Sequence, residues 1–139
     1  MTDQRQLGVE LFNETWRLME SREDDDLMLD CAHASSYHWA LAPECRPENR
    51  VRAAWLISRA YTVAGLSEPA LRHAERCFQL CERYALGDWD LAFAYEALAR
   101  AAKVAGDREG ARSYVELARA VEIAGGEDRA QLERDLATL

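Results

Sequence analysis

Apolar residues recur every three or four positions along most of the chain, which is typical of amphipathic α-helices. Leu7, Leu11, Leu18 and Met19 show this spacing near the beginning. No segment alternates with the period of two that a half-buried strand requires. The pattern predicts helices over residues 4–20, 26–41, 49–64, 68–85, 89–105, 108–124 and 127–137.

Glycine and aspartate mark the boundaries between these segments. Gly65 and Gly106 follow the third and fifth helices, where a glycine in the left-handed conformation commonly ends a helix. The run Asp24–Asp26 precedes the second helix, and acidic side chains are favourable at a helix N-terminus. The stretch APECRPENR, beginning at Ala42, holds two of the three prolines and is expected to be the longest loop.

The composition supports a globular helical protein. The chain has 139 residues, and we expect residues 1–139 to form a single domain. Alanine and leucine are abundant, whereas the β-branched residues that sheets prefer are few. A hydrophobic fraction of 49% argues against disorder.

Charge and hydropathy restrict the class of partner and the location. A net charge of −8 argues against binding to nucleic acid. No apolar stretch is long enough to cross a membrane, and the N-terminus lacks the features of a signal peptide. We therefore expect a cytoplasmic protein without a membrane partner, in which all four cysteines are free thiols.

The chain contains an internal repeat. The segment WLISRAYTVAGLSEPALRHAERCFQL begins at residue 55, and EALARAAKVAGDREGARSYVELARAV begins at residue 96. Aligning Gly65 with Gly106, 41 residues later, also aligns Arg59 with Arg100. A weaker copy, 42 residues earlier, places Arg17 at the position of Arg59 but lacks the glycine. Three related units are therefore expected.

The repeated unit resembles the tetratricopeptide (TPR) repeat, strongly over residues 50–125 and weakly before them. The period of 41 residues is longer than the usual value of about 34, and the closing proline is absent. The resemblance implies an all-α fold: a right-handed solenoid fragment of three antiparallel helical hairpins with a C-terminal capping helix. The matching positions are Trp55, Ile57, Tyr61, Gly65 and Ala70 in one unit, and Tyr95, Leu98, Ala102, Gly106 and Ala111 in the next.

The resemblance also implies a concave groove, lined by the first helix of each hairpin, in which a peptide lies. There, Arg17, Arg59 and Arg100 are expected to stack as a ladder that binds a carboxylate or an acidic peptide. Trp55 would supply an apolar anchor. In the alternative interpretation, the arginines pair with acids such as Glu96. The expected groove residues are Asn13, Arg17, Arg52, Trp55, Arg59, Phe93, Arg100 and Lys103.

Histidine and cysteine cluster in the stretch DCAHASSYHWALAPECR, which begins at Asp30. A tetrahedral zinc site needs four convergent nitrogen or sulfur ligands. Cys31 and His38 share a helix face, but His33 points elsewhere, and a fourth ligand is not evident. We expect these residues to be structural, with a ligand contact through His33, Tyr37 or His38 as the alternative.

A second set, formed by His73, Cys77 and Cys81, advances by four residues along the fourth helix. Its two ends are about 12 Å apart at 1.5 Å per residue, too far for one metal ion. Buried cysteine also commonly acts as a small hydrophobic residue. The sequence therefore predicts no metal and no cofactor.

No motif of a nucleophilic, phosphate-binding or dinucleotide-binding enzyme occurs in the sequence, so we expect no catalytic residues and no enzyme activity. The favoured function is that of a scaffold or adaptor that binds a peptide or a partner protein in the groove. Two alternatives remain. One is a homodimer that covers the open ends of a short solenoid. The other is a protein that binds a small molecule or a metal through histidine and cysteine.

Overall fold

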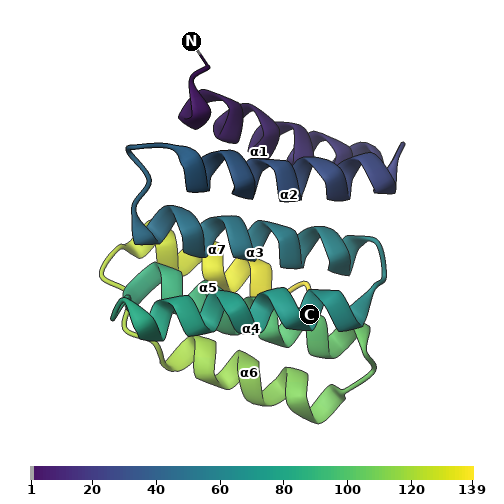
Figure 1. Ribbon diagram of the computed structural model, residues 1–139. Helices are drawn as coiled ribbons and strands as arrows, with labels where there is room; N and C mark the ends of the chain where they lie inside the picture. Colours follow the sequence, from purple (N-terminus) through teal and green to yellow (C-terminus); the bar gives the residue numbers. More distant parts are fainter. Residues whose placement is uncertain (1) are drawn as a thin grey trace.

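The computed structural model describes residues 2–139, which form seven helices and no strand (Figure 1). The all-α prediction is confirmed. The sixth helix ends at Ala120 rather than near residue 124, and the third begins at Pro47 rather than residue 49. The helices are α1 (Gln4–Ser21), α2 (Asp25–Leu41), α3 (Pro47–Val63), α4 (Ser67–Arg83), α5 (Asp88–Val104), α6 (Arg108–Ala120) and α7 (Gly126–Leu136).

Aspartate starts three of the helices. Asp3, Asp24 and Asp107 are the N-cap residues of α1, α2 and α6, and each carboxylate accepts a backbone N–H from the first turn. Such caps satisfy amides that have no partner within the helix. Pro47 occupies the first position of α3, where its missing N–H costs nothing.

Three helices end in the same left-handed turn. Gly65 and Gly106 have φ angles of 79° and 81°, and the following N–H groups donate to carbonyls in the last turn of the helix. Ala85 takes the equivalent place after α4 with φ 52°, and Leu86 N–H donates to the Cys81 carbonyl. A residue with a Cβ is strained in this conformation, whereas glycine is not.

We expect Ala85→Gly to raise the free energy of unfolding and Gly106→Ala to lower it, each by about 1 kcal/mol. Space around Gly106 is open, so the loss there comes from the backbone conformation rather than from a clash. Gly126→Ala, at an equally open site without positive φ, is the control. Urea denaturation measures all three variants, and a gain for Gly106→Ala would contradict the explanation.

The helices form antiparallel pairs that stack side by side (Figure 1). Within the pairs, α1 packs on α2, α3 on α4, and α5 on α6; between them, α2 packs on α3 and α4 on α5. Contacts of α3 with α1 and α5 place the first helices of the pairs in one layer. Ala60, Ala70 and Ala74 are completely buried, and their small side chains permit close approach of the helices.

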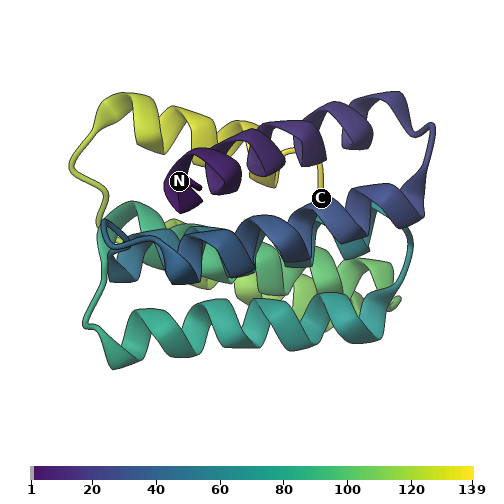
Figure 2. The ribbon, with the colours of Figure 1, turned by 45° about the horizontal axis from the view of Figure 1, so that its top comes forward.

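Helix α7 lies over the layer formed by α1, α3 and α5. Its backbone packs on α5 rather than on α6, and Figure 2 shows α7 (yellow) on the same side of the molecule as α1 (purple). Leu132 and Leu136 are buried in a cluster with Phe93. Helix α7 therefore covers part of the face of α1, α3 and α5 on which the groove was expected.

A membrane-spanning helix needs a long apolar stretch, and none of the helices within residues 2–139 provides one.

Candidate functional site

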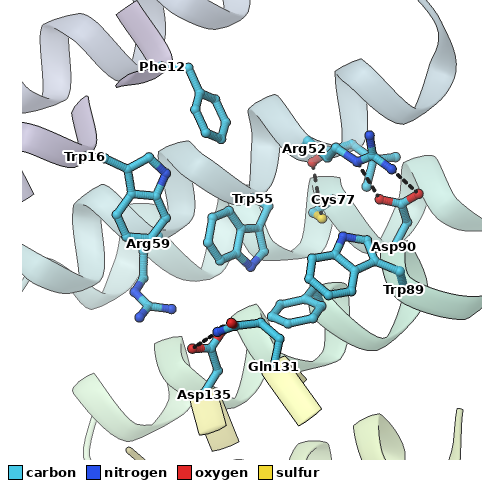
Figure 3. Close-up of a pocket in the computed structure, with 12 residues that line it drawn as sticks. Phe12, Trp16, Arg52, Trp55, Arg59, Cys77, Trp89, Asp90, Gln131 and Asp135 are labelled. Atoms are coloured by element: carbon cyan, nitrogen blue, oxygen red, sulfur yellow. Dashed lines mark hydrogen bonds and ion pairs between the residues drawn. The ribbon is translucent and has the colours of Figure 1, made fainter. Parts of the chain in front are cut away.

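A cavity of about 510 Å³ lies between α1, α3, α5 and α7 (Figure 3). Pockets of this size hold small organic molecules or the side chains of a bound peptide. Its wall is mainly apolar, and five aromatic side chains and four charged ones contribute to it. The lining residues are Phe12, Trp16, Val51, Arg52, Trp55, Arg59, Cys77, Trp89, Asp90, Phe93, Gln131 and Asp135.

A row of four aromatic rings crosses three helices at this cavity. The ring centroids of Trp16 and Trp55 are 5.8 Å apart, those of Trp55 and Phe93 6.2 Å, and those of Phe93 and Trp89 4.3 Å. These separations are favourable for aromatic pairs. Trp55 occupies the middle of the row and packs against all four hydrophobic clusters of the protein.

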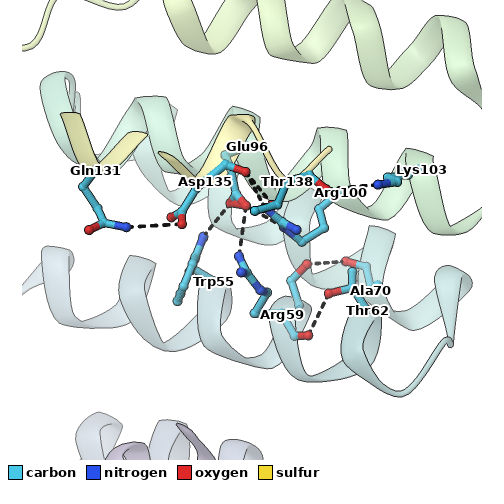
Figure 4. A network of polar contacts seen from close by, with 11 residues as sticks. Trp55, Arg59, Thr62, Ala70, Glu96, Arg100, Lys103, Gln131, Asp135 and Thr138 are labelled. Carbon is cyan, nitrogen blue, oxygen red and sulfur yellow. Dashed lines mark hydrogen bonds and ion pairs between the residues drawn. The ribbon is translucent and has the colours of Figure 1, made fainter. Parts of the chain in front are cut away.

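The completely buried carboxylate of Glu96 is hydrogen-bonded to the central ring of this row, that of Trp55 (Figure 4). It accepts hydrogen bonds from Trp55 Nε1 at 3.2 Å, from Arg59 Nη1 at 3.1 Å and from Arg100 Nε at 2.7 Å. A buried carboxylate is tolerated only when it is paired and hydrogen-bonded in this way. Glu96 therefore joins α3 to α5 and fixes the orientation of Trp55.

Arg59 and Arg100 both pair with this carboxylate, so one negative charge faces two positive charges. Burial lowers the pKa of Arg59, while the charge of Glu96 opposes that shift. The guanidinium also lies 6.0 Å from the centre of the Trp16 ring and 5.7 Å from that of Trp55. Arg59 is thus a cation within an aromatic wall.

Arg100 and Lys103 hold the end of α7. Arg100 Nη2 donates to the Asp135 carbonyl at 3.0 Å and to Thr138 Oγ1 at 2.8 Å, and Lys103 Nζ donates to the Thr138 carbonyl at 3.0 Å (Figure 4). Cations are favourable at the C-terminal end of a helix because its carbonyls lack partners there. These two side chains therefore help to keep α7 over the layer.

An ion pair closes the other end of the cavity. Arg52 Nε lies 3.1 Å from Asp90 Oδ1, and Arg52 Nη2 lies 3.4 Å from Asp90 Oδ2. Burial raises the pKa of Asp90, and the hydrogen bond from Arg52 opposes that shift. This pair contributes no net charge to the cavity.

The structure brings some of the predicted groove residues together and separates others. Arg52, Trp55, Arg59 and Phe93 all line the cavity, whereas Arg100 and Lys103 contact the end of α7.

Asn13 and Arg17 are exposed, and Arg17 pairs with Glu14 and Glu23. The expected ladder of three arginines is therefore a pair, Arg59 and Arg100, joined through Glu96. Arg59 and Arg100 both pair with Glu96, as the alternative interpretation of the sequence predicted.

Several residues of the cavity wall were not among the groove residues predicted from the sequence. The available signal was two pairs of aromatic residues, each pair one helical turn apart: Phe12 with Trp16, and Trp89 with Phe93. The missed residues are Phe12, Trp16, Val51, Cys77, Trp89, Asp90, Gln131 and Asp135.

The histidines lie outside this cavity. His33 Nε2 is 2.8 Å from the Tyr61 hydroxyl, and the His33 and His73 rings are 5.4 Å apart. Burial, followed by the charge of His33, lowers the pKa of His73 to about 4, and burial also lowers the pKa of His33. Both rings are therefore neutral at pH 7 and pack as aromatic groups against Tyr61, which stacks on His73.

His38 is separate from His33, because its Nδ1 lies 2.6 Å from Gln4 Oε1 on α1. Tyr37 is exposed and contacts His38 edge-on. His33 is therefore in one place, and Tyr37 and His38 are together in another. A ligand contact through any of these three residues stays a prediction.

The cysteines are free, and three of them, Cys31, Cys77 and Cys81, are buried. Burial raises the pKa of Cys81 to about 11 and that of Cys77 well above its usual value. Within residues 2–139, no three histidine, cysteine or acidic side chains converge as metal ligands would. The absence of a bound metal stays a prediction, which elemental analysis of the purified protein would test.

Comparison with protein-family models, with curated proteins and with solved structures finds no match for the chain.

Proposed function

We propose that the protein is a non-catalytic, TPR-like binding module that receives a segment of a partner protein in the cavity between α1, α3, α5 and α7. The observation that carries the proposal is the row of four rings, from Trp16 to Trp89, along the wall of a cavity of about 510 Å³. Desolvated aromatic pockets of this kind are where protein interfaces concentrate their binding energy.

The position of α7 favours a compact anchor over a long peptide laid along the groove. Gln131 and Asp135 of α7 face Trp16 and Phe12 of α1 across the same cavity, so that the opening is bounded on both sides (Figure 3). A partner that inserts one large apolar side chain would fill this space, and its flanking residues would remain at the rim.

The charges in the wall favour an uncharged anchor. Arg52 is paired with Asp90, and Arg59 is paired with Glu96, while Asp135 adds a second carboxylate to the cavity wall. An acidic side chain in the cavity would meet the carboxylates of Asp90 and Asp135 as well as the two arginines, so the wall offers no excess of positive charge to an acidic peptide. We therefore propose a partner segment whose anchor is aromatic or aliphatic.

A binding role agrees with the chemistry of the wall. Cys77 is a buried thiol whose raised pKa keeps it protonated, and burial of that kind makes a cysteine unreactive. Glu96 already accepts three hydrogen bonds and is not a free base. These groups support packing and recognition rather than proton transfer.

Filling the cavity tests the proposal. Peptides would be selected from a displayed random library on the wild-type protein, and their affinities measured by calorimetry. We expect Gln131→Trp, which places an indole in the cavity, to weaken them at least tenfold. Ala130→Trp is the matched control, because Ala130 is the exposed neighbouring residue of the same helix and does not line the cavity.

Circular dichroism and urea denaturation would confirm that both tryptophan variants are folded. Selection of peptides that bind Gln131→Trp as tightly as the wild type would contradict the proposal. So would the absence of any selected peptide.

A further inference from the structure

Two polar groups in the cavity wall have hydrogen-bonding capacity that the protein does not use. Of the five N–H donors of Arg59, one of the two on Nη1 donates to Glu96, and none of the other four has a protein acceptor within residues 2–139. The Asp135 carboxylate accepts one hydrogen bond, from Gln131 Nε2 to Oδ1 at 3.2 Å. A partly buried arginine and a carboxylate with free positions thus line the same cavity.

Arg59 and Asp135 are near one another without touching. Both side chains line the same cavity, and Figures 3 and 4 both draw the Asp135 carboxylate near the Arg59 guanidinium. Yet their nitrogen and oxygen atoms lie beyond the 4.0 Å limit of an ion pair, a statement that covers the described residues 2–139. Both groups have unused hydrogen-bonding positions in one cavity, so a ligand there can offer a donor to Asp135 and an acceptor to Arg59.

The chemistry of this pair selects among large side chains. Phenylalanine or leucine would fill the aromatic space but leave both groups without partners, which is costly once water is excluded. An indole N–H can only donate, so it would serve Asp135 and leave Arg59. A carboxylate would be repelled by Asp135, and an ammonium group by Arg59. A phenol hydroxyl both donates and accepts.

We infer that the anchor is a tyrosine of the partner, an inference that rests on the proposed function. Its ring lies against Trp16 and Trp55, and its hydroxyl lies between Arg59 and Asp135. The hydroxyl donates to the Asp135 carboxylate and accepts from the Arg59 guanidinium. No net charge enters the cavity, and both groups obtain a partner. The site is discontinuous, because α1 and α3 supply the ring contacts and α7 supplies the acceptor.

Side-chain analogues give a direct test on the full-length chain. The probes are 4-methylphenol, which is the tyrosine side chain, and toluene, which is that of phenylalanine. Binding is followed by NMR through the indole N–H signals of Trp16 and Trp55, both in the cavity wall. We expect 4-methylphenol to bind at least tenfold more tightly than toluene.

A matched pair of variants assigns the preference to Asp135. In Asp135→Ala we expect the preference for the phenol to fall below threefold, because the phenol loses its acceptor and toluene no longer leaves a carboxylate without a partner. Glu127→Ala, which removes an exposed acid from the first turn of the same helix, should keep the full preference. The carbonyl of residue 135 still accepts from Arg100 in the alanine variant, so α7 retains that anchor.

The acetylated and amidated tripeptides Gly-Tyr-Gly and Gly-Phe-Gly separate a partner's tyrosine from a free phenol. We expect the same preference for tyrosine in the peptide pair. Binding of 4-methylphenol without binding of Gly-Tyr-Gly would overturn the assignment to a partner protein.

Equal affinity for 4-methylphenol and toluene would overturn the role of Arg59 and Asp135 while leaving an apolar binding cavity, and therefore the proposed function, in place. Failure of both probes to shift the two indole signals would overturn the tyrosine site. The library selection with Gln131→Trp tests the proposed function separately.

Discussion

Replacement of Glu96 by alanine is expected to lower the free energy of unfolding by about 3–5 kcal/mol, the loss typical when one member of a buried ion pair is removed. The Glu96 carboxylate is completely buried and accepts from Trp55, Arg59 and Arg100. Without it, two guanidinium groups remain close together. Arg100 keeps acceptors at the end of α7, whereas Arg59 keeps none within residues 2–139.

Urea denaturation at neutral pH measures this loss. Glu96→Gln retains the shape but not the charge, so it should be destabilising by a smaller amount. Glu14→Ala, which removes an exposed acid paired with Arg17, is the control and should change stability little. In the double variant Glu96→Ala with Arg59→Ala, the losses should be less than additive because the two side chains interact. A Glu96→Ala variant as stable as Glu14→Ala would refute the role given to the carboxylate.

Trp55→Ala is expected to cause a loss of about 3 kcal/mol, near the lower end of the range for truncation of a large aromatic side chain, because Trp55 is only partly buried. The Trp55 ring packs against all four hydrophobic clusters and lies between the rings of Trp16 and Phe93. Its removal would leave a void at the place where α1, α3 and α5 meet, and Glu96 would lose one of its donors.

Two variants separate these effects in the same urea experiment. Trp55→Phe keeps most of the apolar contact and removes the N–H donor, so we expect a loss of about 1–2 kcal/mol. Trp89→Ala truncates a ring at the end of the row and should be clearly less destabilising than Trp55→Ala. Equal losses for Trp55→Ala and Trp89→Ala would mean that Trp55 has no central role.

The helices could be predicted from the sequence because their signals are local. Apolar spacing, aspartate caps and glycine turns act within a few residues of each boundary. The end of α6 was misplaced for a physical reason. Val121 and Ile123 continue the apolar pattern, but they reach the cluster around Phe93 from a non-helical segment, where Arg129 donates to the Val121 carbonyl. Apolar spacing alone does not distinguish these two ways of burying a side chain.

The candidate site could be predicted only in part because it depends on contacts between distant segments. The recurrence of arginine indicated one helix face, but not that Glu96, one turn before Arg100, would be buried beneath Arg59. Arg17 has acids of its own in Glu14 and Glu23, which keep it at the surface.

The place of α7 follows from the burial of Leu132 and Leu136 on α5. Since this contact is not local, no spacing within α7 reveals it.

An occupant of the cavity would touch two helices that otherwise pack on different neighbours. Helix α1 packs on α2 and α3, and α7 packs on α5, yet Phe12 and Asp135 line the same space. In stacked helical pairs, the outermost helices open most readily because each has neighbours on one side only. A bound side chain would contact both of these outer helices and so disfavour the local unfolding of each. Amide hydrogen exchange in α1 and in α7 should therefore slow together when the cavity is filled, although the two helices belong to opposite ends of the chain.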